Sequence, residues 1–356
     1  MKASIITMTC TYNYGATLQA FALQQYIESL GCECDIINHM GWENHRTISY
    51  KEGLKSFLLK VLFKKQLELG YERFEKFYKQ HMHMTRRYNT VKDLVDDPPD
   101  SDLFITGSDQ VWNPRDPKYQ KFFLEFVPDS RMKISYAASL GDSFIPEDKK
   151  RYYSEQLKRF NAISVREEQG KKLIGELTDK DVNVNCDPVI LIDSDKWRSL
   201  EKPIKNLRKP YILCYMIYVP EWFNTFVKEV KRNTGMDIVV LGLNGISKVY
   251  DDKYIRCAGP AEFLWLFDNA EMVISSSFHG NVYSILFEKK LVSLPDPKRP
   301  DRIHNLLSLF GLESFELYEN DISIIEKLKP VDKETMKKVI SQQQQKTNEY
   351  FSAVLS

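Results

Sequence analysis

The sequence lacks several features that would place it in a specialised class of proteins. It has no run of about 18 apolar residues, so it predicts no membrane-spanning helix. The first ten residues, MKASIITMTC, lack the layout of a signal peptide and are typical of a strand. We therefore expect a cytoplasmic protein.

An excess of charge of either sign is also missing. Fifty Lys and Arg residues oppose 49 Asp and Glu residues, which gives a net charge of +1 and predicts no nucleic-acid partner. Of the six cysteines, the one close pair, Cys32 and Cys34, forms a C-x-C that lacks the usual spacing of zinc ligands. We expect reduced core thiols and no metal site.

The 356 residues form two halves in which strand-like and helical segments alternate. In the first half, the runs ASIITM and CECDIIN flank an amphipathic segment and predict a β-α-β unit. In the second half, the runs YILCYMI, DIVVLG, EMVISS and LVSLP predict another mostly parallel sheet. We expect an N-terminal Rossmann-like domain over 1–195, a linker over 196–209, a C-terminal Rossmann-like domain over 210–330, and a helix over 331–356 that packs back on the N-terminal domain.

Residues 51–87 have a basic character. The stretch 51–92 holds 11 Lys and Arg residues against 4 Asp and Glu residues, a local balance of +7. Apolar residues recur at helical spacing on both sides of Gly70 and predict two basic amphipathic helices. Such helices either cover a sheet with their lysines in solvent or contact an anionic membrane surface.

The sequence VISSSFHGNVYSILF, residues 273–287, joins a buried strand to a buried helix without a linker. A helix that starts near His279 points its free N–H groups and positive dipole end at the carboxyl edge of the sheet, where ligands bind. His279 can donate a hydrogen bond, carry positive charge or transfer a proton near neutral pH. The turn predicts an anion site, with a serine-capped helix and a packed histidine as the alternative. The residues expected to help are Ser275, Ser276 and Ser277 as hydroxyl donors and Gly280 as a point of close ligand approach.

Three other stretches place polar residues where a predicted strand ends. In TYNYGATLQ, Asn13 and Gly15 lie at a strand-to-helix turn, where they either bind a polar ligand or simply begin the helix. The loop TGSDQVWNP, residues 106–114, has a carboxylate, amides and an indole, which suits a sugar; the alternative is an Asp-capped loop around a buried tryptophan. In ISVREEQG, Arg166 either binds an anion through two N–H donors or pairs with an adjacent glutamate at the surface.

In this order, these stretches resemble the polysaccharide pyruvyl transferase family. The resemblance rests on NYGATLQAFAL, FITGSDQVWNP, ISYAASLG, SVREEQG, CDPVIL and SSSFHG. It implies a glycosyltransferase-B-like α/β fold, with two Rossmann-like domains facing across a cleft. It also implies transfer of a pyruvyl group from phosphoenolpyruvate to two hydroxyls of one sugar, in a surface polysaccharide or its lipid-linked precursor, which forms a pyruvate ketal. Phosphoenolpyruvate is a co-substrate, and no cofactor is implied.

The resemblance also assigns roles to residues. Arg166 matches an arginine expected to bind the donor's anionic groups, and His279 matches the histidine of an Arg-x-His turn. This chain departs from that turn because Ser277 stands in place of the arginine. We expect His279, Arg166 and Asp109 to act in catalysis, with Asp109 as a base or sugar ligand. The expected donor-binding residues are Ser275, Ser276, Ser277, Gly280, Lys298, Arg299 and Arg302, of which the last three can replace the missing charge. The expected acceptor-binding residues are Asn13, Tyr14, Gly15, Ser108, Gln110, Trp112 and Asn113.

Two other functions fit the same residues. A glycosyltransferase that uses a nucleotide-sugar would have the same fold and would place a diphosphate at the helix that starts near His279. A non-catalytic glycan-binding relative would keep the fold without the arginine at position 277. The expected partners are phosphoenolpyruvate and a sugar or glycan acceptor, with contact to the inner face of the membrane if the basic helices bind it.

Overall fold

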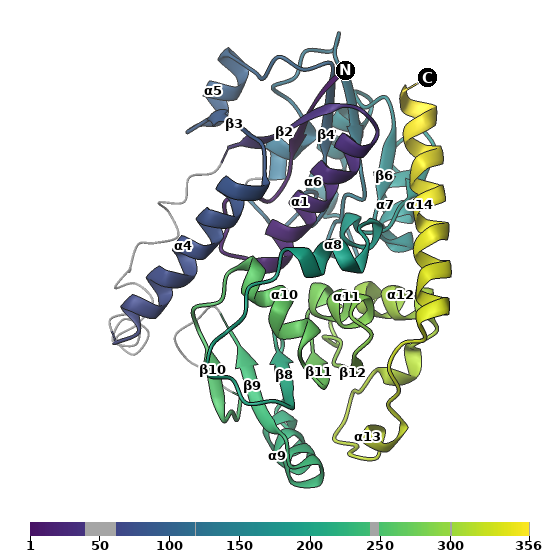
Figure 1. The fold of residues 1–356 in the computed structure, drawn as a ribbon. Helices are drawn as coiled ribbons and strands as arrows, with labels where there is room; N and C mark the ends of the chain where they lie inside the picture. Colours follow the sequence, from purple (N-terminus) through teal and green to yellow (C-terminus); the bar gives the residue numbers. More distant parts are fainter. Residues whose placement is uncertain (40–61, 118, 243–248, 300, 356) are drawn as a thin grey trace. The chain divides into compact units, whose positions relative to one another are not determined.

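The computed structural model describes residues 1–39, 62–117, 119–242, 249–299 and 301–355. These residues form two compact α/β units, coloured along the sequence in Figure 1. Unit 1 consists of the described residues of Met1–His45, Tyr78–Ile192 and Ile340–Ser356, and unit 2 of those of Arg46–Phe77 and Asp193–Val339.

Unit 1 is built on a five-stranded parallel sheet with the order β3-β2-β1-β4-β5. Strand β4, between β1 and β5, is buried along its whole length, as expected for a parallel sheet that is covered on both faces. Two further parallel strands, β6 and β7, are joined to β5 by an isolated bridge between Ile134 and Ala162. The strands are β1 (Lys2–Ile6), β2 (Glu33–Asn38), β3 (Met84–Arg87), β4 (Leu103–Thr106), β5 (Met132–Ser135), β6 (Ile163–Val165) and β7 (Val182–Val184).

Helix α1 (Tyr14–Ser29) follows β1 and has clear signals at both ends. The Asn13 side chain caps its start by accepting a hydrogen bond from Ala16 N at 3.2 Å, and Gly31 follows its end with φ +82°. The other helices of unit 1 are α5 (Val91–Asp96), α6 (Glu147–Leu157), α7 (Glu168–Gly175) and the 3₁₀ helices η2 (Tyr119–Phe123) and η3 (Pro188–Leu191).

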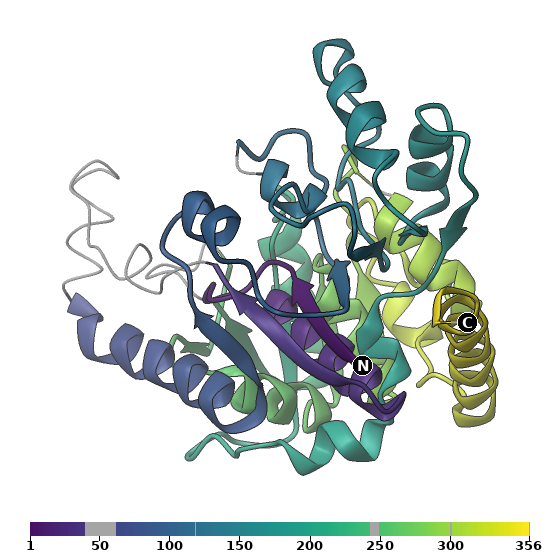
Figure 2. The same cartoon turned by 90° about the horizontal axis from the view of Figure 1, so that it is seen from above.

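The last helix, α14 (Lys333–Leu355), contributes its residues from 340 onward to unit 1. The Phe351 ring stacks on Tyr136 with centroids 5.3 Å apart, and the Tyr350 hydroxyl donates to Ser135 O at 2.7 Å. Figures 1 and 2 both show α14, in yellow, alongside β6. The C-terminal helix is therefore part of the same unit as the first strand.

Unit 2 repeats the topology of unit 1 with the parallel order β10-β9-β8-β11-β12. Its strands are β8 (Tyr211–Tyr215), β9 (Asp237–Leu241), β10 (Lys253–Ile255), β11 (Met272–Ser275) and β12 (Lys290–Ser293). Its helices are α8 (Ser194–Ser199), α9 (Phe223–Thr234), α10 (Pro260–Asp268), α11 (Phe278–Leu286), α12 (Asp301–Phe310), α13 (Ile324–Lys327) and the 3₁₀ helix η4 (Glu313–Phe315).

Both sheets have the strand order of a Rossmann fold, so each has one point where the order reverses. In unit 1 this point lies between β1 and β4, and in unit 2 between β8 and β11. The carboxyl ends of these four strands are where a ligand is expected in an open α/β sheet. The expectation of two Rossmann-like domains is confirmed at the level of each unit.

Helix α4 (Lys64–His81) corrects the prediction for residues 51–87. It is a single helix that runs through Gly70, and residues 84–87 form strand β3 instead of a helix. The expected apolar and basic residues between 51 and 61 lie outside the described residues. Gly70 lies inside this helix, where it allows a close contact, since a Cβ there would lie 3.3 Å from Arg256 O.

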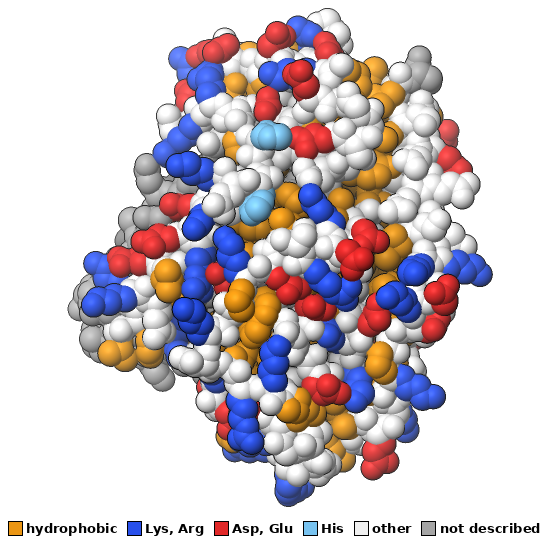
Figure 3. All heavy atoms as spheres, viewed as in Figure 1, with side chains coloured by type: hydrophobic (Ala, Val, Ile, Leu, Met, Phe, Trp, Pro, Cys, Tyr) orange, Lys and Arg blue, Asp and Glu red, His pale blue; other side chains and the backbone are white. Residues whose placement is uncertain are grey.

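The unit boundaries also differ from the expected domains. Residues 64–77 of α4 belong to unit 2, where Arg73 forms an ion pair with Glu262 at 3.2 Å and donates to Cys257 O at 2.6 Å. The segment 193–209, expected to end one domain and form a linker, also belongs to unit 2. Figure 3 shows positive and negative side chains interspersed over the viewed face, in line with the net charge of +1.

Candidate functional site

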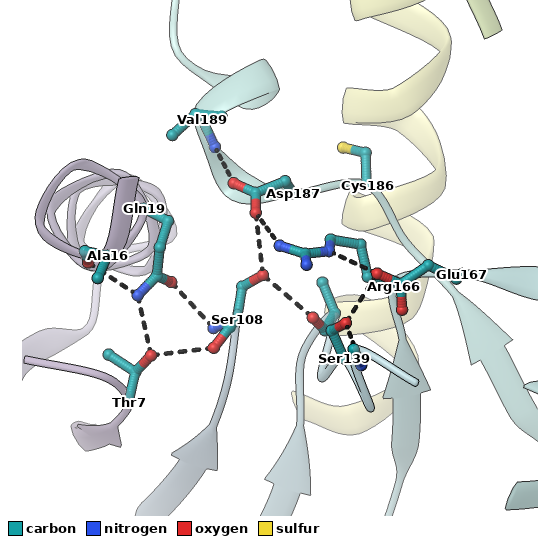
Figure 4. Close-up of polar contacts among 12 residues, drawn as sticks. Thr7, Ala16, Gln19, Ser108, Ser139, Arg166, Glu167, Cys186, Asp187 and Val189 are labelled. Carbon is teal, nitrogen blue, oxygen red and sulfur yellow. Dashed lines mark hydrogen bonds and ion pairs between the residues drawn. The ribbon is translucent and has the colours of Figure 1, made fainter. Parts of the chain in front are cut away.

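In unit 1, buried polar side chains gather at the carboxyl ends of the strands, and Arg166 is at their centre (Figure 4). Arg166 follows β6, and its guanidinium donates from Nη1 to Asp187 Oδ2 at 2.7 Å and from Nε to Glu167 Oε1 at 3.0 Å. The exposed fractions of these side chains are 2% for Arg166, 9% for Glu167 and 0% for Asp187. Arg166 is therefore the cation of a buried ion-pair group.

The electrostatics of this group are dominated by carboxylates. Burial by itself would lower the pKa of Arg166. The carboxylates of Glu167, Asp187 and Asp109 raise this pKa by more, so it lies above its usual value. Because one guanidinium faces two bonded carboxylates, the formal charge of the trio is −1. This environment disfavours a further anion beside Arg166.

Both carboxylates also fix neighbouring loops. Asp187 Oδ1 accepts Val189 N at 3.2 Å and so caps the 3₁₀ helix η3, while Asp187 Oδ2 lies 3.3 Å from Ser108 Oγ. Glu167 Oε1 accepts the Ser139 hydroxyl at 2.8 Å. The Arg166 group thus joins the segments that follow β4, β5, β6 and β7.

A second part of the network ties this group to the first strand and helix. Gln19 Nε2 donates to Thr7 Oγ1 at 2.9 Å, and Gln19 Oε1 accepts Ser108 N at 3.1 Å. Thr7 Oγ1 in turn donates to Ser108 O at 3.0 Å. All three residues are fully buried, so α1, β1 and the loop after β4 are held in one arrangement.

The backbone at the same edge adopts unusual conformations. Cys10 after β1, Asp109 after β4 and Ala137 after β5 have φ values of +51°, +67° and +46°. Residues with a Cβ pay roughly 1–2 kcal/mol in the left-handed region, and such strain is concentrated at functional sites. Gly107 has φ +120° and no space for a side chain, because a Cβ there would lie 2.1 Å from Tyr136 O. The surrounding network holds these turns in place.

Asp109 is the one predicted carboxylate at this edge, and solvent reaches it. It is partly exposed, and among the described residues its carboxylate accepts no hydrogen bond. Its backbone oxygen accepts Val111 N at 2.8 Å and Ser139 N at 2.9 Å, so the loop holds the side chain at the edge. Gln110 and Asn113 are also partly exposed, with Asn113 Nδ2 donating to Gln110 Oε1 at 2.9 Å. Asn13 is exposed at the cap of α1.

Four of the predicted acceptor-binding residues are buried. Trp112 is 0% exposed, stacks on Phe123 at 5.2 Å and donates from Nε1 to Phe122 O at 3.3 Å. It packs in the core, so the expected stacking on a sugar ring is wrong for this side chain. Tyr14 and Ser108 are also 0% exposed, and Gly15 is buried within α1.

In unit 2, the turn between β11 and α11 has the expected form, and its serines organise the turn itself. Ser275 Oγ donates to Tyr215 O at 2.8 Å, and Ser276 Oγ donates to Tyr218 O at 2.7 Å. Ser277 caps α11 by accepting Gly280 N at 3.3 Å. The hydroxyls of Ser275 and Ser276 are engaged with the chain's own backbone, so an anion could bind them only by exchange of those bonds.

Gly280 has a different role from the expected one. A Cβ at this position would lie 2.2 Å from Ser275 Oγ and 3.0 Å from Tyr215 Cδ1. The missing side chain therefore lets α11 pack closely on β8 and β11, which corrects the expectation that it opens the backbone to a ligand.

Arg302 lies beside the start of α11. Its guanidinium carbon is 5.5 Å from the centre of the Phe278 ring, and Phe278 is the first residue of that helix. His279, the second residue, is 7% exposed. Lys298 and Arg299 are exposed, and their backbone N–H groups bond to Asp296. Of the three candidate replacements for an arginine at position 277, Arg302 is the one with a described contact to α11.

Sequence analysis did not identify several residues of these networks. Gln19, Thr7 and Asp187 were not singled out, although Asp187 lies in CDPVIL, one of the stretches of the resemblance. The expected surface pairing of Arg166 with a glutamate is half correct: Glu167 is a partner, but the pair is buried. The functional role expected of Arg166 in donor binding stays a prediction.

The described residues contain neither a membrane-spanning helix nor a cluster of metal ligands. No helix among them is long and apolar enough to cross a membrane. Within the same residues, no three His, Cys, Asp or Glu side chains gather in a way that could hold a metal ion.

Comparisons with solved structures support the fold. The UDP-GlcNAc 2-epimerase of Neisseria meningitidis bound to UDP-GlcNAc is 12% identical, with 98% of this chain and 94% of that chain covered and a TM-score of 0.53. A putative UDP-N-acetylglucosamine 2-epimerase of Listeria monocytogenes is 11% identical, with 96% and 90% covered and a TM-score of 0.51. At this identity the likeness shows the fold alone, which is of the glycosyltransferase-B type.

Comparisons with sequences address the family. None of the curated protein sequences compared with this chain matches it significantly. The family model described as polysaccharide pyruvyl transferase matches residues 13–295, which include the start of α1, the loop after β4, the Arg166 group and the start of α11. The chain therefore belongs to the polysaccharide pyruvyl transferase family.

Proposed function

We propose that this protein transfers a pyruvyl group from phosphoenolpyruvate to two hydroxyls of one sugar, in a surface polysaccharide or its lipid-linked precursor, and so forms a pyruvate ketal. The observation that supports this most is the family match over residues 13–295, which contains the Arg166 group, Asp109 and His279. The distribution of charge supports a donor site in unit 2 and an acceptor site in unit 1.

The donor belongs in unit 2 on electrostatic grounds. Phosphoenolpyruvate carries a phosphate and a carboxylate, so its site must supply positive charge and N–H donors. The start of α11 supplies a partial positive charge and first-turn N–H groups without acceptors inside the helix. Arg302 adds a full charge beside Phe278, the first residue of α11. His279 follows Phe278 and is suited to hold the leaving phosphate or to deliver a proton.

The acceptor belongs at the edge of unit 1. The Arg166 group has a formal charge of −1, and the Asp109 carboxylate acts on the same guanidinium. Like charge makes this edge unfavourable for a phosphate but suitable for sugar hydroxyls, which donate hydrogen bonds to carboxylates. In this proposal Asp109 accepts a hydroxyl hydrogen, while Arg166, which the family resemblance predicts to bind the donor, instead positions the loops that follow four strands.

The reaction can be written with all atoms accounted for. A sugar hydroxyl attacks C2 of phosphoenolpyruvate while the methylene carbon gains a proton and becomes a methyl group. The C2–O bond to phosphate breaks, and the second hydroxyl bonds to C2 and closes the ketal ring. Of the two hydroxyl protons, one balances the proton taken up by the methylene and the other leaves with the phosphate. Asp109 would accept a hydroxyl proton, and His279 would protonate the methylene or the leaving phosphate.

Calorimetric titration tests the donor assignment. The wild-type protein should bind phosphoenolpyruvate, and Arg302→Gln should weaken binding by about tenfold to a hundredfold, as expected for loss of a hydrogen-bonded charge. Arg232→Gln is the control, since Arg232 is an arginine of unit 2 with a 76% exposed side chain, and it should change binding by less than about twofold. Binding of UDP-GlcNAc but not phosphoenolpyruvate would instead favour a nucleotide-sugar glycosyltransferase. Glycan binding with no product from any donor would favour a non-catalytic relative.

A lipid-linked acceptor would bring the protein to a membrane surface, and the start of α4, with Leu62 two residues before it, has suitable residues for that contact. Leu62 and Leu69 are 72% and 41% exposed, and Lys64 and Lys65 lie between them with exposed side chains. Sedimentation with vesicles of anionic lipid should show binding that Lys64→Glu with Lys65→Glu reduces. Equal sedimentation of both proteins would remove the membrane contact from the proposal.

A further inference from the structure

We propose that unit 1 carries a second glycan site, a pocket for neutral sugar residues between α14 and strands β5 to β7. The pocket has a volume of about 510 Å³, within the range of ligand-binding cavities. Met132 and Asn161 lie at the amino ends of β5 and β6, opposite the edge that holds the Arg166 group, while Asn185 follows β7. The inference rests on the proposed function, since it assigns the pocket to the acceptor glycan.

One wall of the pocket presents amide groups. Asn185 is 1% exposed, and its Oδ1 accepts the Ser164 hydroxyl at 2.7 Å, which leaves its Nδ2 as a donor. Asn161 likewise has its amide oxygen engaged, since its Oδ1 accepts Lys133 N at 2.9 Å, and its Nδ2 is left as a donor. Asn183 is exposed, and its side chain bonds to none of the described residues. Three amides on or beside strands thus offer N–H donors, and those of Asn185 and Asn161 are held by hydrogen bonds to their oxygens.

The opposite wall comes from α14 and adds one charge of each sign. Lys346 and Glu349 both line the pocket and are exposed. Their formal charges cancel, so the pocket does not select an anion or a cation. The Tyr350 hydroxyl donates to Ser135 O at 2.7 Å. The ring of Tyr350, together with Val354 and the other apolar lining residues, forms an apolar surface.

This combination identifies the chemical class of the ligand. A neutral sugar has hydroxyls that both accept from amides and ammonium groups and donate to a carboxylate, as well as an apolar ring face. The volume of about 510 Å³ is suited to one or two hexose units. A polymeric acceptor has many such units, so a second site can hold the chain while another sugar residue reacts.

Binding by saturation-transfer NMR tests this site without requiring turnover. The probes are neutral tetrasaccharides of glucose, galactose, mannose or N-acetylglucosamine, with galacturonate tetrasaccharide as the anionic comparison. At least one neutral probe should bind, and Asn183→Ala with Lys346→Ala should weaken its binding at least tenfold. Both residues are exposed, so the variant is expected to fold.

The controls separate this site from the proposed function. Asn89→Ala with Lys172→Ala removes the same two side-chain types from exposed positions of unit 1 outside the pocket, and should bind like wild type. His279→Ala should lose transfer but keep tetrasaccharide binding, so the two proposals can fail independently. The second site is contradicted if no neutral probe binds, if the pocket variant binds like wild type, or if galacturonate alone binds.

Discussion

Replacing Arg166 by alanine should cost this protein much of the stability of unit 1. The substitution removes the guanidinium that bonds to Glu167 and Asp187 and leaves two buried carboxylates facing each other without a cation. Neither carboxylate can turn to solvent easily, because Asp187 also bonds to Val189 N and Glu167 to the Ser139 hydroxyl.

The expected magnitude follows from the burial of these groups. Removing one partner of a buried ion pair typically costs about 3–5 kcal/mol, because the remaining charge is left without compensation in a low-dielectric environment. For a domain of 150–250 residues, each kcal/mol lowers the melting temperature by roughly 2–4 °C, so Arg166→Ala should lower it by roughly 6–20 °C. Arg166→Lys keeps the charge but loses the two-donor geometry, so its melting temperature should lie between those of Arg166→Ala and wild type.

Thermal unfolding followed by circular dichroism measures this difference. The matched control is Arg151→Ala, which removes an arginine with an 89% exposed side chain from its pair with Glu155 and should leave the melting temperature close to that of wild type. A melting temperature for Arg166→Ala within about 2 °C of wild type would refute the argument. If the large shift is found, a loss of activity in Arg166→Ala cannot by itself show that Arg166 touches the donor.

Three further predictions concern pH and packing. Burial, aided by Lys121, lowers the pKa of His39 from 6.5 to about 3, so stability should fall by about 1.4 kcal/mol per pH unit as the pH drops below 6.5. Urea unfolding of His39→Gln should show that slope removed, and an unchanged slope would contradict the burial argument. Burial also raises the pKa of Glu201 from 4.5 to about 7. The contribution of Glu201 to the stability of the fold is therefore complete below pH 4.5 and is lost as the pH rises through 7. The stability of Glu201→Gln relative to wild type should therefore be higher at pH 8 than at pH 5. An equal difference in stability at both pH values would contradict the raised pKa of Glu201. Gly280→Ala should destabilise the protein by about 1–3 kcal/mol in thermal unfolding, because the added Cβ meets Ser275 Oγ. The double variant Gly280→Ala with Ser275→Ala should recover part of this stability. If it recovers none, another contact is responsible for the loss.

The strand-to-helix turns could be predicted from the sequence because their signals are local. The apolar run before Ser275 and the helical spacing after His279 place a turn there, and the structure has β11 end at Ser275 and α11 begin at Phe278. Asn13 likewise caps α1 directly after the first strand. Parallel sheets then bring such turns to the carboxyl edge, so these turns could be placed at the edge of a sheet before the structure was known.

The partners within each site could not be predicted in the same way. Arg166 stands next to two glutamates in the sequence, which favoured a surface pair, whereas its burial depends on Asp187, 21 positions away. Trp112 is followed by polar residues in a loop, yet it stacks on Phe123 inside the core. Gly280 looked like a point of ligand approach, and only the position of Ser275 shows that it serves helix packing.

The grouping of α4 with unit 2 was missed for a related reason. The apolar and basic residues of 64–81 predict an amphipathic helix, but its partner surface is about 180 positions further along the chain, at Cys257 and Glu262. Sequence periodicity identifies the face that packs and not the surface it packs against. The strand β3 follows within three residues of the end of α4 and is too short, at four residues, to show its own pattern.

The most direct test of the central claim is mass spectrometry of sugars incubated with the protein and with phosphoenolpyruvate labelled with ¹³C in all of its carbons. The account predicts an acceptor hexoside that gains one labelled pyruvyl ketal, with release of inorganic phosphate, and a loss of this product by orders of magnitude in His279→Ala. An acceptor that gains a hexose from a nucleotide-sugar, with no label incorporated from phosphoenolpyruvate, would contradict it.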